Sequence, residues 1–183
     1  MGYAVAINKA WEDLLKLDPP ESLSLKFLAD EYTIDCRQKK IFSLSCNVPA
    51  KDFAAILILH YLAQKLKGLP ELTGEWVSFK ELSGIQGYAE AFRKRAIEPI
   101  IIKYGKSPES ILAVLERLPA KKAGQADVSI VVEVFAGVPA LVELWRGDAE
   151  FEPEANILFD QSISRIFCTE DIVVLAQFVA MSL

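Results

Sequence analysis

Apolar residues recur at helical spacing along three long stretches of the chain. In Tyr3–Leu15 they return every third or fourth position, which predicts an amphipathic helix ending before Asp18-Pro19-Pro20, because proline cannot continue a helix. Pro49–Lys67 carries a wider apolar stripe, so we expect this helix to be buried on most sides. Tyr88–Tyr104 predicts a third helix, which Pro99 should kink or divide.

Residues typical of helix starts predict two further helices. Ser107-Pro108-Glu109 combines an N-cap serine, a proline at the first helical position and an acid in the first turn. Thr169-Glu170-Asp171 has threonine as its expected N-cap, and its acids complement the positive end of the helix dipole. Between these helices, Gln161–Phe167 fits a helical turn.

The clearest strands are Val128–Phe135 and Ala140–Trp145, which are rich in β-branched and apolar residues. Gly137-Val138-Pro139 lies between them and predicts an antiparallel hairpin. Both strands carry apolar residues on both faces, interrupted by the acids Glu133 and Glu143, as expected for central or helix-covered strands.

The rest of the chain gives weaker patterns. Shorter strands are expected at Thr33–Arg37, Ile41–Ser45 and Glu75–Phe79, whereas Ser22–Ala29 fits a helical turn or an extended segment equally. A flexible connection is expected at Pro119–Gln125, and irregular structure that allows a short extended piece at Phe151–Asp160.

These elements do not alternate as β-α-β units. They predict an α+β fold in which a small, mainly antiparallel sheet of three to five strands packs with about five helices. The length of 183 residues fits a single domain spanning 1–183.

Composition and charge narrow the function classes. The chain is 52% hydrophobic, yet its most apolar runs, Phe53–Leu62 and Ile172–Met181, are shorter than the roughly 20 residues that cross a bilayer. The net charge is −5 and the basic residues are scattered, which argues against nucleic-acid binding. No basic segment precedes a long apolar run at the start of the chain, so we expect a cytoplasmic protein.

Cysteine and histidine are scarce. Cys36, Cys46 and Cys168 form no Cys-x-x-Cys pair and, with the only histidine, His60, are expected to be free and mostly buried structural residues. We therefore expect neither a metal site nor an iron–sulfur cluster. Dinucleotide-binding, phosphate-loop, serine-hydrolase and zinc-protease motifs are also missing from the sequence.

Two regions gather residues that often serve in binding. The first, Gly74–Arg95, is rich in glycine and carries aromatic rings for stacking and arginines that suit carboxylate or phosphate. The simpler interpretation, which we favour, is that the rings anchor the loop and the arginines pair with acids. The candidate ligand-binding residues of this region are Trp76, Glu81, Tyr88, Phe92, Arg93 and Arg95.

The second region, Trp145–Asp160, is rich in acids. Paired carboxylates can act as general acid and base or bind an oxygen-preferring cation. The simpler interpretation, again favoured, is that Asn156 and Asp160 cap turns. The candidate residues here are Trp145, Asp148, Asn156 and Asp160, with Glu150 as a further carboxylate.

Several strings in these regions resemble a prokaryotic family known as domain of unknown function 3786. They include Thr73-Gly74-Glu75-Trp76, Ala91-Phe92-Arg93-Lys94-Arg95, Leu144-Trp145-Arg146-Gly147-Asp148 and Ala155-Asn156-Ile157-Leu158-Phe159-Asp160. The resemblance covers about residues 34–183, preceded by the N-terminal amphipathic helix.

The resemblance implies a setting in anaerobes. Some family members look fused to a four-cysteine iron–sulfur module, and others accompany corrinoid or one-carbon proteins. This chain lacks such a module, so the resemblance implies a partner of that kind and no cluster of its own.

Three functions remain open, and the sequence does not say whether the protein is an enzyme. The first is a small-molecule or cofactor-handling accessory domain in anaerobic redox or corrinoid metabolism. The second is a protein-interaction module that docks on an iron–sulfur or corrinoid partner. The third is a hydrolase or transferase that uses Glu81, Asp148, Glu150 or Asp160.

Overall fold

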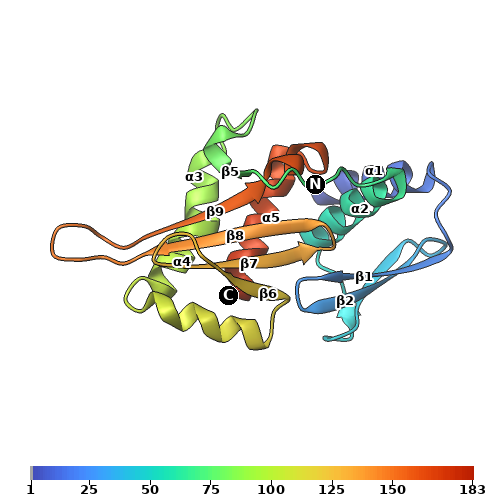
Figure 1. The fold of residues 1–183 in the computed structure, drawn as a ribbon. Coiled ribbons are helices and arrows are strands. Elements are labelled where there is room, and N and C mark those ends of the chain that lie inside the picture. The colour runs from blue at the N-terminus through green and yellow to red at the C-terminus, as the bar shows by residue number, and fades with distance from the viewer. Residues whose placement is uncertain (1) are drawn as a thin grey trace. The chain divides into compact units, whose positions relative to one another are not determined.

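The computed structural model describes residues 2–183 and the side chains from Tyr3 onward. The chain forms two compact units, one ending at Glu71 and the other spanning Leu72–Leu183. Helices and antiparallel strands occur in both units (Figure 1), which confirms the predicted α+β class.

The N-terminal unit contains two helices and a four-stranded antiparallel sheet. Helix α1 (Gly2–Leu15) contacts α2 (Asp52–Lys67), and their shared core includes Trp11, Leu14 and Ile58. The strands follow the order of the chain: β1 (Ser22–Phe27), β2 (Asp30–Asp35), β3 (Lys40–Ser43) and β4 (Val48–Pro49). The segment Ser22–Ala29, for which the sequence allowed a helical turn or an extended conformation, is therefore mostly extended, because its first six residues form β1.

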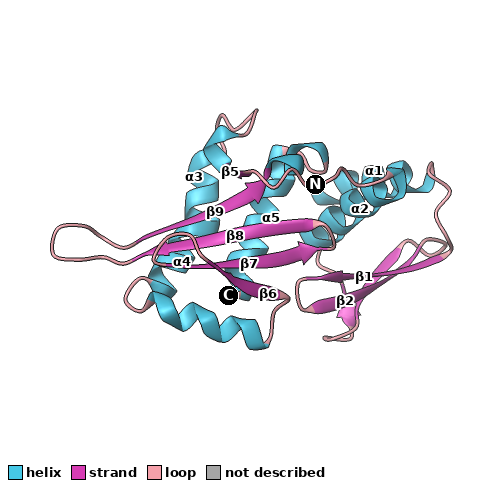
Figure 2. Cartoon of the chain, in the orientation of Figure 1, coloured by secondary structure: helices cyan, strands magenta, loops and turns pink. Residues whose placement is uncertain are grey.

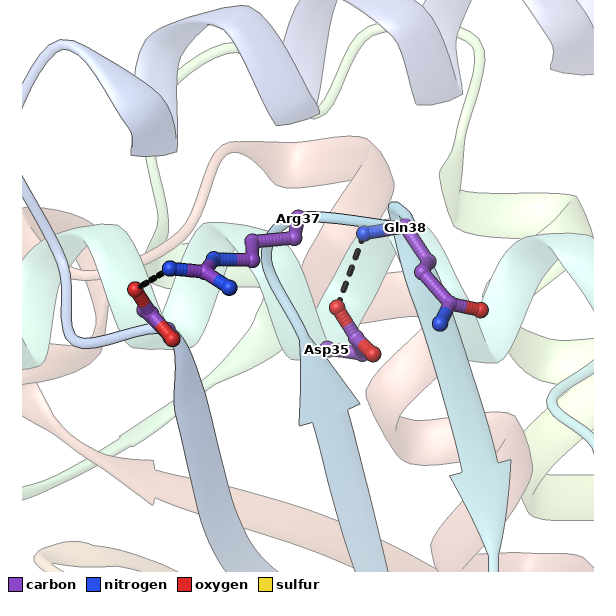
Figure 3. Close-up of polar contacts among 4 residues, drawn as sticks. Asp35, Arg37 and Gln38 are labelled. Carbon is purple, nitrogen blue, oxygen red and sulfur yellow. Dashed lines mark hydrogen bonds and ion pairs between the residues drawn. The ribbon is translucent and has the colours of Figure 1, made fainter.

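Polar contacts fix the turn between β2 and β3. The Gln38 N–H donates to Asp35 Oδ1 at 2.8 Å, and Arg37 forms an ion pair with Glu21 at the start of the unit's sheet (Figure 3). Lys39 has a positive φ of 53°, which completes a turn that lacks glycine and asparagine.

The C-terminal unit is built on a five-stranded antiparallel sheet in the order β5-β9-β8-β7-β6. The predicted hairpin is confirmed as β7 (Val128–Phe135) and β8 (Val138–Trp145). The edge strands are β5 (Trp76–Ser78), close to its predicted position, and β6 (Ala120–Ala123). The fifth strand, β9 (Glu154–Asp160), lies between β5 and β8.

One face of this sheet is an uninterrupted apolar layer across the three central strands β7, β8 and β9. Its side chains are completely buried: Ile130, Val132, Val134, Ala140, Val142, Leu144, Ile157 and Phe159. Phe159 meets Phe92 of α3 edge to face at a ring-centroid separation of 6.4 Å, so the helices cover this face. Figure 1 shows α3, α4 and α5 on one side of the sheet.

Those helices follow the predicted segments with local differences. Tyr88–Tyr104 is one helical run of three parts: α3 (Ala89–Phe92), a π-helical turn η2 (Arg93–Ile97) and α4 (Glu98–Tyr104). The irregularity thus comes before Pro99, which takes a first-turn position of α4 where its missing N–H costs little. The final helix is α5 (Thr169–Ser182).

Three short 3₁₀ helices complete the unit: η1 (Phe79–Glu81), η3 (Pro108–Glu116) and η4 (Gln161–Arg165). Neither predicted N-cap acts through its side chain. Ser107 precedes η3 without a capping hydrogen bond, and Thr169 is the first residue of α5. The Thr169 hydroxyl instead donates to the Ser83 carbonyl at 3.0 Å, so it links the loop after η1 to the start of α5.

One loop prediction was wrong and a second was incomplete. Residues Ala120–Ala123 within the expected flexible connection pair with Ser129–Val132 as β6, and the expected irregular segment contains β9. Ala120–Ala123 is small or polar and carries little local strand signal, so pairing with β7 decided its structure. In β9 the same holds only for Glu154–Asn156, which precede the apolar residues Ile157, Leu158 and Phe159.

Candidate functional site

Asp160 is the most densely hydrogen-bonded of the predicted site residues. Its side chain accepts hydrogen bonds from the Thr73 N–H and hydroxyl at 3.1 Å, from the Gly74 N–H at 2.8 Å and from the Ser162 N–H at 2.9 Å. Burial would raise the pKa of this carboxyl, but the donors outweigh it and lower the pKa to about 2. Asp160 therefore fixes the approach to β5 and caps η4.

The other candidates near β5 have separate structural partners. Trp76 lies opposite Asp160 in the strand register and is half-buried. The Ser78 N–H donates to Glu81 Oε2 at 2.7 Å, and this backbone bond lowers the pKa of Glu81. The Tyr88 hydroxyl donates to Glu170, a hydrogen bond that raises the pKa of Tyr88.

The remaining candidates of Gly74–Arg95 divide between core and surface. Phe92 is buried and stacks on Phe79, with ring centroids 4.2 Å apart and an interplanar angle of 6°. Arg93 is exposed and its Nε lies 3.3 Å from Glu98 Oε1. Arg95 is also exposed. These placements match the simpler interpretation, in which rings anchor the segment and an arginine pairs with an acid.

A shallow depression lies beside Asp160 and is too narrow to hold a water molecule. Gly137–Pro139, together with Ser162, Ile163 and Ile166, supply the rest of its lining. Among Trp76, Tyr88, Arg93, Arg95, Trp145 and Asp160, only Asp160 lines it.

The acidic candidates of the second region belong to the β8–β9 loop (residues 146–153) and the strands beside it. Trp145 ends β8 opposite Glu154 and is half-buried. Asn156 lies opposite Glu143, and its Oδ1 accepts from the Ile157 N–H at 3.0 Å. Asp148 is exposed and accepts from the N–H groups of Glu150 and Phe151, both at 2.8 Å, which lowers its pKa.

The β8–β9 loop is fixed at its base. Arg146 forms an ion pair with Glu109, and the Arg146 N–H donates to Asp127 Oδ2 at 2.9 Å. The backbone at Gly147 runs so close to Pro153 that an added Cβ would lie 2.8 Å from the proline ring. The same proline ring would lie 2.9 Å from a Cβ at Gly105, at the end of α4.

The tip of this loop presents an apolar side chain. Asp148 closes the turn, because its N–H donates to the Phe151 carbonyl at 2.8 Å while its carboxylate accepts from the backbone. Phe151 itself is 69% exposed. The loop projects beyond the end of the sheet (Figure 2). Phe151 is not among the site residues predicted from the sequence, although a phenylalanine flanked by four acids is a usable signal.

The cysteines and the histidine differ partly from expectation. All three cysteines are free, but only Cys36 is buried, whereas Cys46 and Cys168 are exposed. The prediction of mostly buried thiols was therefore wrong, because Cys46 lies in a turn and Cys168 precedes α5. His60 is half-buried in α2. Among residues 3–183, no three His, Cys, Asp or Glu side chains gather as a metal site.

Within the described part of the chain, no helix is both long and apolar enough to span a bilayer. No curated protein and no solved structure was found to match the chain. One family model does match, over residues 10–182, and it is described as a domain of unknown function, DUF3786. The match covers both compact units and includes part of α1, which the sequence resemblance had placed outside the family region. The chain therefore belongs to the DUF3786 family.

Proposed function

We propose that this chain is a protein-interaction module that docks on its partner through the β8–β9 loop. The observation that carries this proposal is Phe151, a large apolar side chain that is 69% exposed at the tip of a loop fixed at its base. Exposed aromatic residues of this kind serve as anchors in protein interfaces, since they bury a large apolar area at a low entropic cost.

The fixed base makes the loop suited to binding. A loop that is ordered before it meets its partner loses less conformational freedom on binding than a mobile one. Contacts of Gly147 and Gly105 with Pro153, together with the Arg146–Glu109 ion pair, restrict the loop in the free protein. The Asp148 turn then holds Phe151 away from the core.

The charge of the loop defines the partner surface. Four acids surround Phe151, namely Asp148, Glu150, Glu152 and Glu154, and one basic residue, Arg146, is committed to Glu109. A complementary surface has an apolar pocket for the phenyl ring and a rim of lysine or arginine. In the setting that the family resemblance implies, that partner is an iron–sulfur or corrinoid protein.

The test compares capture by three forms of the tagged full chain from an extract of the source organism prepared without oxygen. The forms are wild type, F151A and the control I102A, which removes another exposed side chain (83%) from α4. We expect wild type and I102A to retain a protein with iron–sulfur or corrinoid absorption. We expect F151A to bind that purified protein at least about tenfold more weakly.

Two results would contradict the proposal. One is equal affinity of wild type and F151A for the purified partner. The other is equal loss in I102A and F151A, which would indicate general surface stickiness. If wild type captures a protein without either cofactor and F151A does not bind that protein, docking through the loop is supported but the proposed class of partner is refuted.

A further inference from the structure

The sheet face opposite the helices of the C-terminal unit carries a row of polar side chains across three central strands. Glu143 of β8 lies directly opposite Ser129 of β7 on one side and Asn156 of β9 on the other. Side chains paired in this way share one face, with Cβ atoms about 5 Å apart. Trp145 lies two residues further along β8 on the same face, which places its Cα about 6.6 Å from the Cα of Glu143.

The burial of Glu143 is energetically unfavourable at this position. The residue is only 8% exposed, and no hydrogen bond or ion pair to its carboxyl occurs among residues 3–183. Burial raises its pKa above the ordinary range. A buried carboxylate without a partner is destabilising, so such a residue in a central strand requires an explanation beyond folding.

The carboxyl oxygens of Glu143 are nevertheless within reach of solvent. Among the described residues, every completely buried side-chain oxygen or nitrogen has a hydrogen-bond partner. Because the carboxyl oxygens of Glu143 have none, they are not completely buried and retain some access to solvent. Its neighbours leave those oxygens unused. Ser129 Oγ accepts from the Gln125 N–H at 3.1 Å, and Asn156 Oδ1 accepts from the Ile157 N–H.

The charges around the row favour a positively charged ligand. Besides Glu143, the ionisable residues in the strands of this face are Glu133, Glu154, Asp160 and Lys121. Glu133 accepts from the Gly137 N–H and Asp160 from Thr73 and Gly74, so these two acids already have donors. Glu143 combines deep burial with free acceptor capacity.

We propose that Glu143 anchors a binding site for an organic cation, an ammonium or guanidinium group, flanked by Trp145 and Asn156. The carboxylate accepts the N–H donors of the cation, and the indole ring of Trp145 offers its negative face to the same charge. The Asn156 side chain supplies a further polar contact. The cation is carried by a free small molecule or by a lysine or arginine side chain of a protein, and the two sources share this chemistry.

The experiment titrates the full chain with benzamidinium, with its neutral analogue benzamide and with a capped Gly-Arg-Gly peptide. Binding is followed by NMR from the indole N–H of Trp145 and the side-chain amide of Asn156. We expect saturable shifts at both residues with benzamidinium or the peptide and none with benzamide. Tighter binding of benzamidinium indicates a small-molecule site, and tighter binding of the peptide indicates a protein side chain.

Two variants define the anchor. E143Q keeps the size of the side chain and should weaken binding at least tenfold. E133Q removes an exposed acid of the same face, four residues along β7 from Ser129, and should change binding less than twofold. N156A provides a second variant, with an expected loss of three- to tenfold. The proposal is overturned if neither cation binds, if benzamide binds as well as benzamidinium, or if E143Q binds like wild type. Because F151A leaves this row intact, loss of docking and loss of cation binding are separate results.

Discussion

An added Cβ at Gly147 would lie 2.8 Å from both Cδ and N of Pro153, so these two residues meet at a separation that only glycine allows. This contact closes the base of the β8–β9 loop. Pro153 also lies against Gly105, which connects the loop to the end of α4.

The first prediction is that G147A loosens this base. The new methyl group forces Pro153 or the backbone of Phe151 to move, at a cost of about 1–3 kcal/mol. Thermal unfolding should show the lower stability, and limited proteolysis should cut within residues 147–153 sooner than in wild type. The control is G124A, since nothing lies within 4 Å of a Cβ there. Equal protease resistance of G147A and wild type would contradict the tight contact.

The second prediction separates core from surface within the first candidate region. F92A removes a buried ring that stacks on Phe79 and touches Phe159, so we expect a loss of about 3–5 kcal/mol in the free energy of unfolding. R95A alters an exposed side chain three residues away and should change stability by less than about 0.5 kcal/mol. Chemical denaturation measures both. A stable F92A would mean that Phe92 is not part of the core.

The third prediction concerns acid stability. The pKa of Asp160 falls from its ordinary 3.8 to about 2 in the folded chain, so its ionised form stabilises the fold above about pH 4. That contribution, of the order of 1–2 kcal/mol, is lost as the pH falls from about 4 to about 2. D160N should therefore destabilise the protein at pH 7, and the difference from wild type should shrink at pH 2–3. Melting curves of both proteins across pH 2–7 test this, and a difference that does not depend on pH would refute it.

The fourth prediction concerns Glu143, whose contribution to stability changes with pH in the direction opposite to that of Asp160. Burial raises the pKa of Glu143, so the folded state favours the protonated carboxyl, and its stabilisation is lost as the pH rises through the folded pKa. Without a ligand, E143Q should be more stable than wild type at pH 7 by about 1 kcal/mol, or about 2–4 °C in Tm. Below about pH 4 the two proteins should melt together. Lower stability of E143Q at pH 7 would indicate that the carboxylate has a favourable partner in the folded chain.

Sequence pattern was sufficient for the elements with strong local signals. The β7–β8 hairpin and the helices α1, α2 and α5 follow from apolar spacing and from flanking proline and glycine. β6 and the first part of β9 could not be predicted, because Ala120–Ala123 and Glu154–Asn156 have strand conformation only through their partners. The π-helical turn η2 likewise has no distinct sequence signature, since Arg93–Ile97 fits an ordinary α-helix.

The site predictions show the same limit. The capping role expected for Asp160 follows from short-range chemistry that asparagine and aspartate share, and the structure confirms it. Asn156, expected to cap a turn in the same way, lies within β9 instead, so that prediction was wrong. By contrast, the importance of Phe151 and Glu143 depends on exposure and burial, which only the assembled sheet defines. The acid within the apolar strand β8 was visible in the sequence, but its isolation from donors was not.

The position of β9 between β5 and β8 has a consequence for the order in which the protein can fold during synthesis. Thr73 and Asp160 are separated by 87 positions, and β5 pairs only with β9. The hairpin of β7 and β8 can form as soon as it is made, because its partners are neighbours in sequence. β5, although it emerges from the ribosome far earlier, has no strand to join until residue 160 follows, so the segment before α3 must wait exposed through most of the synthesis of its unit.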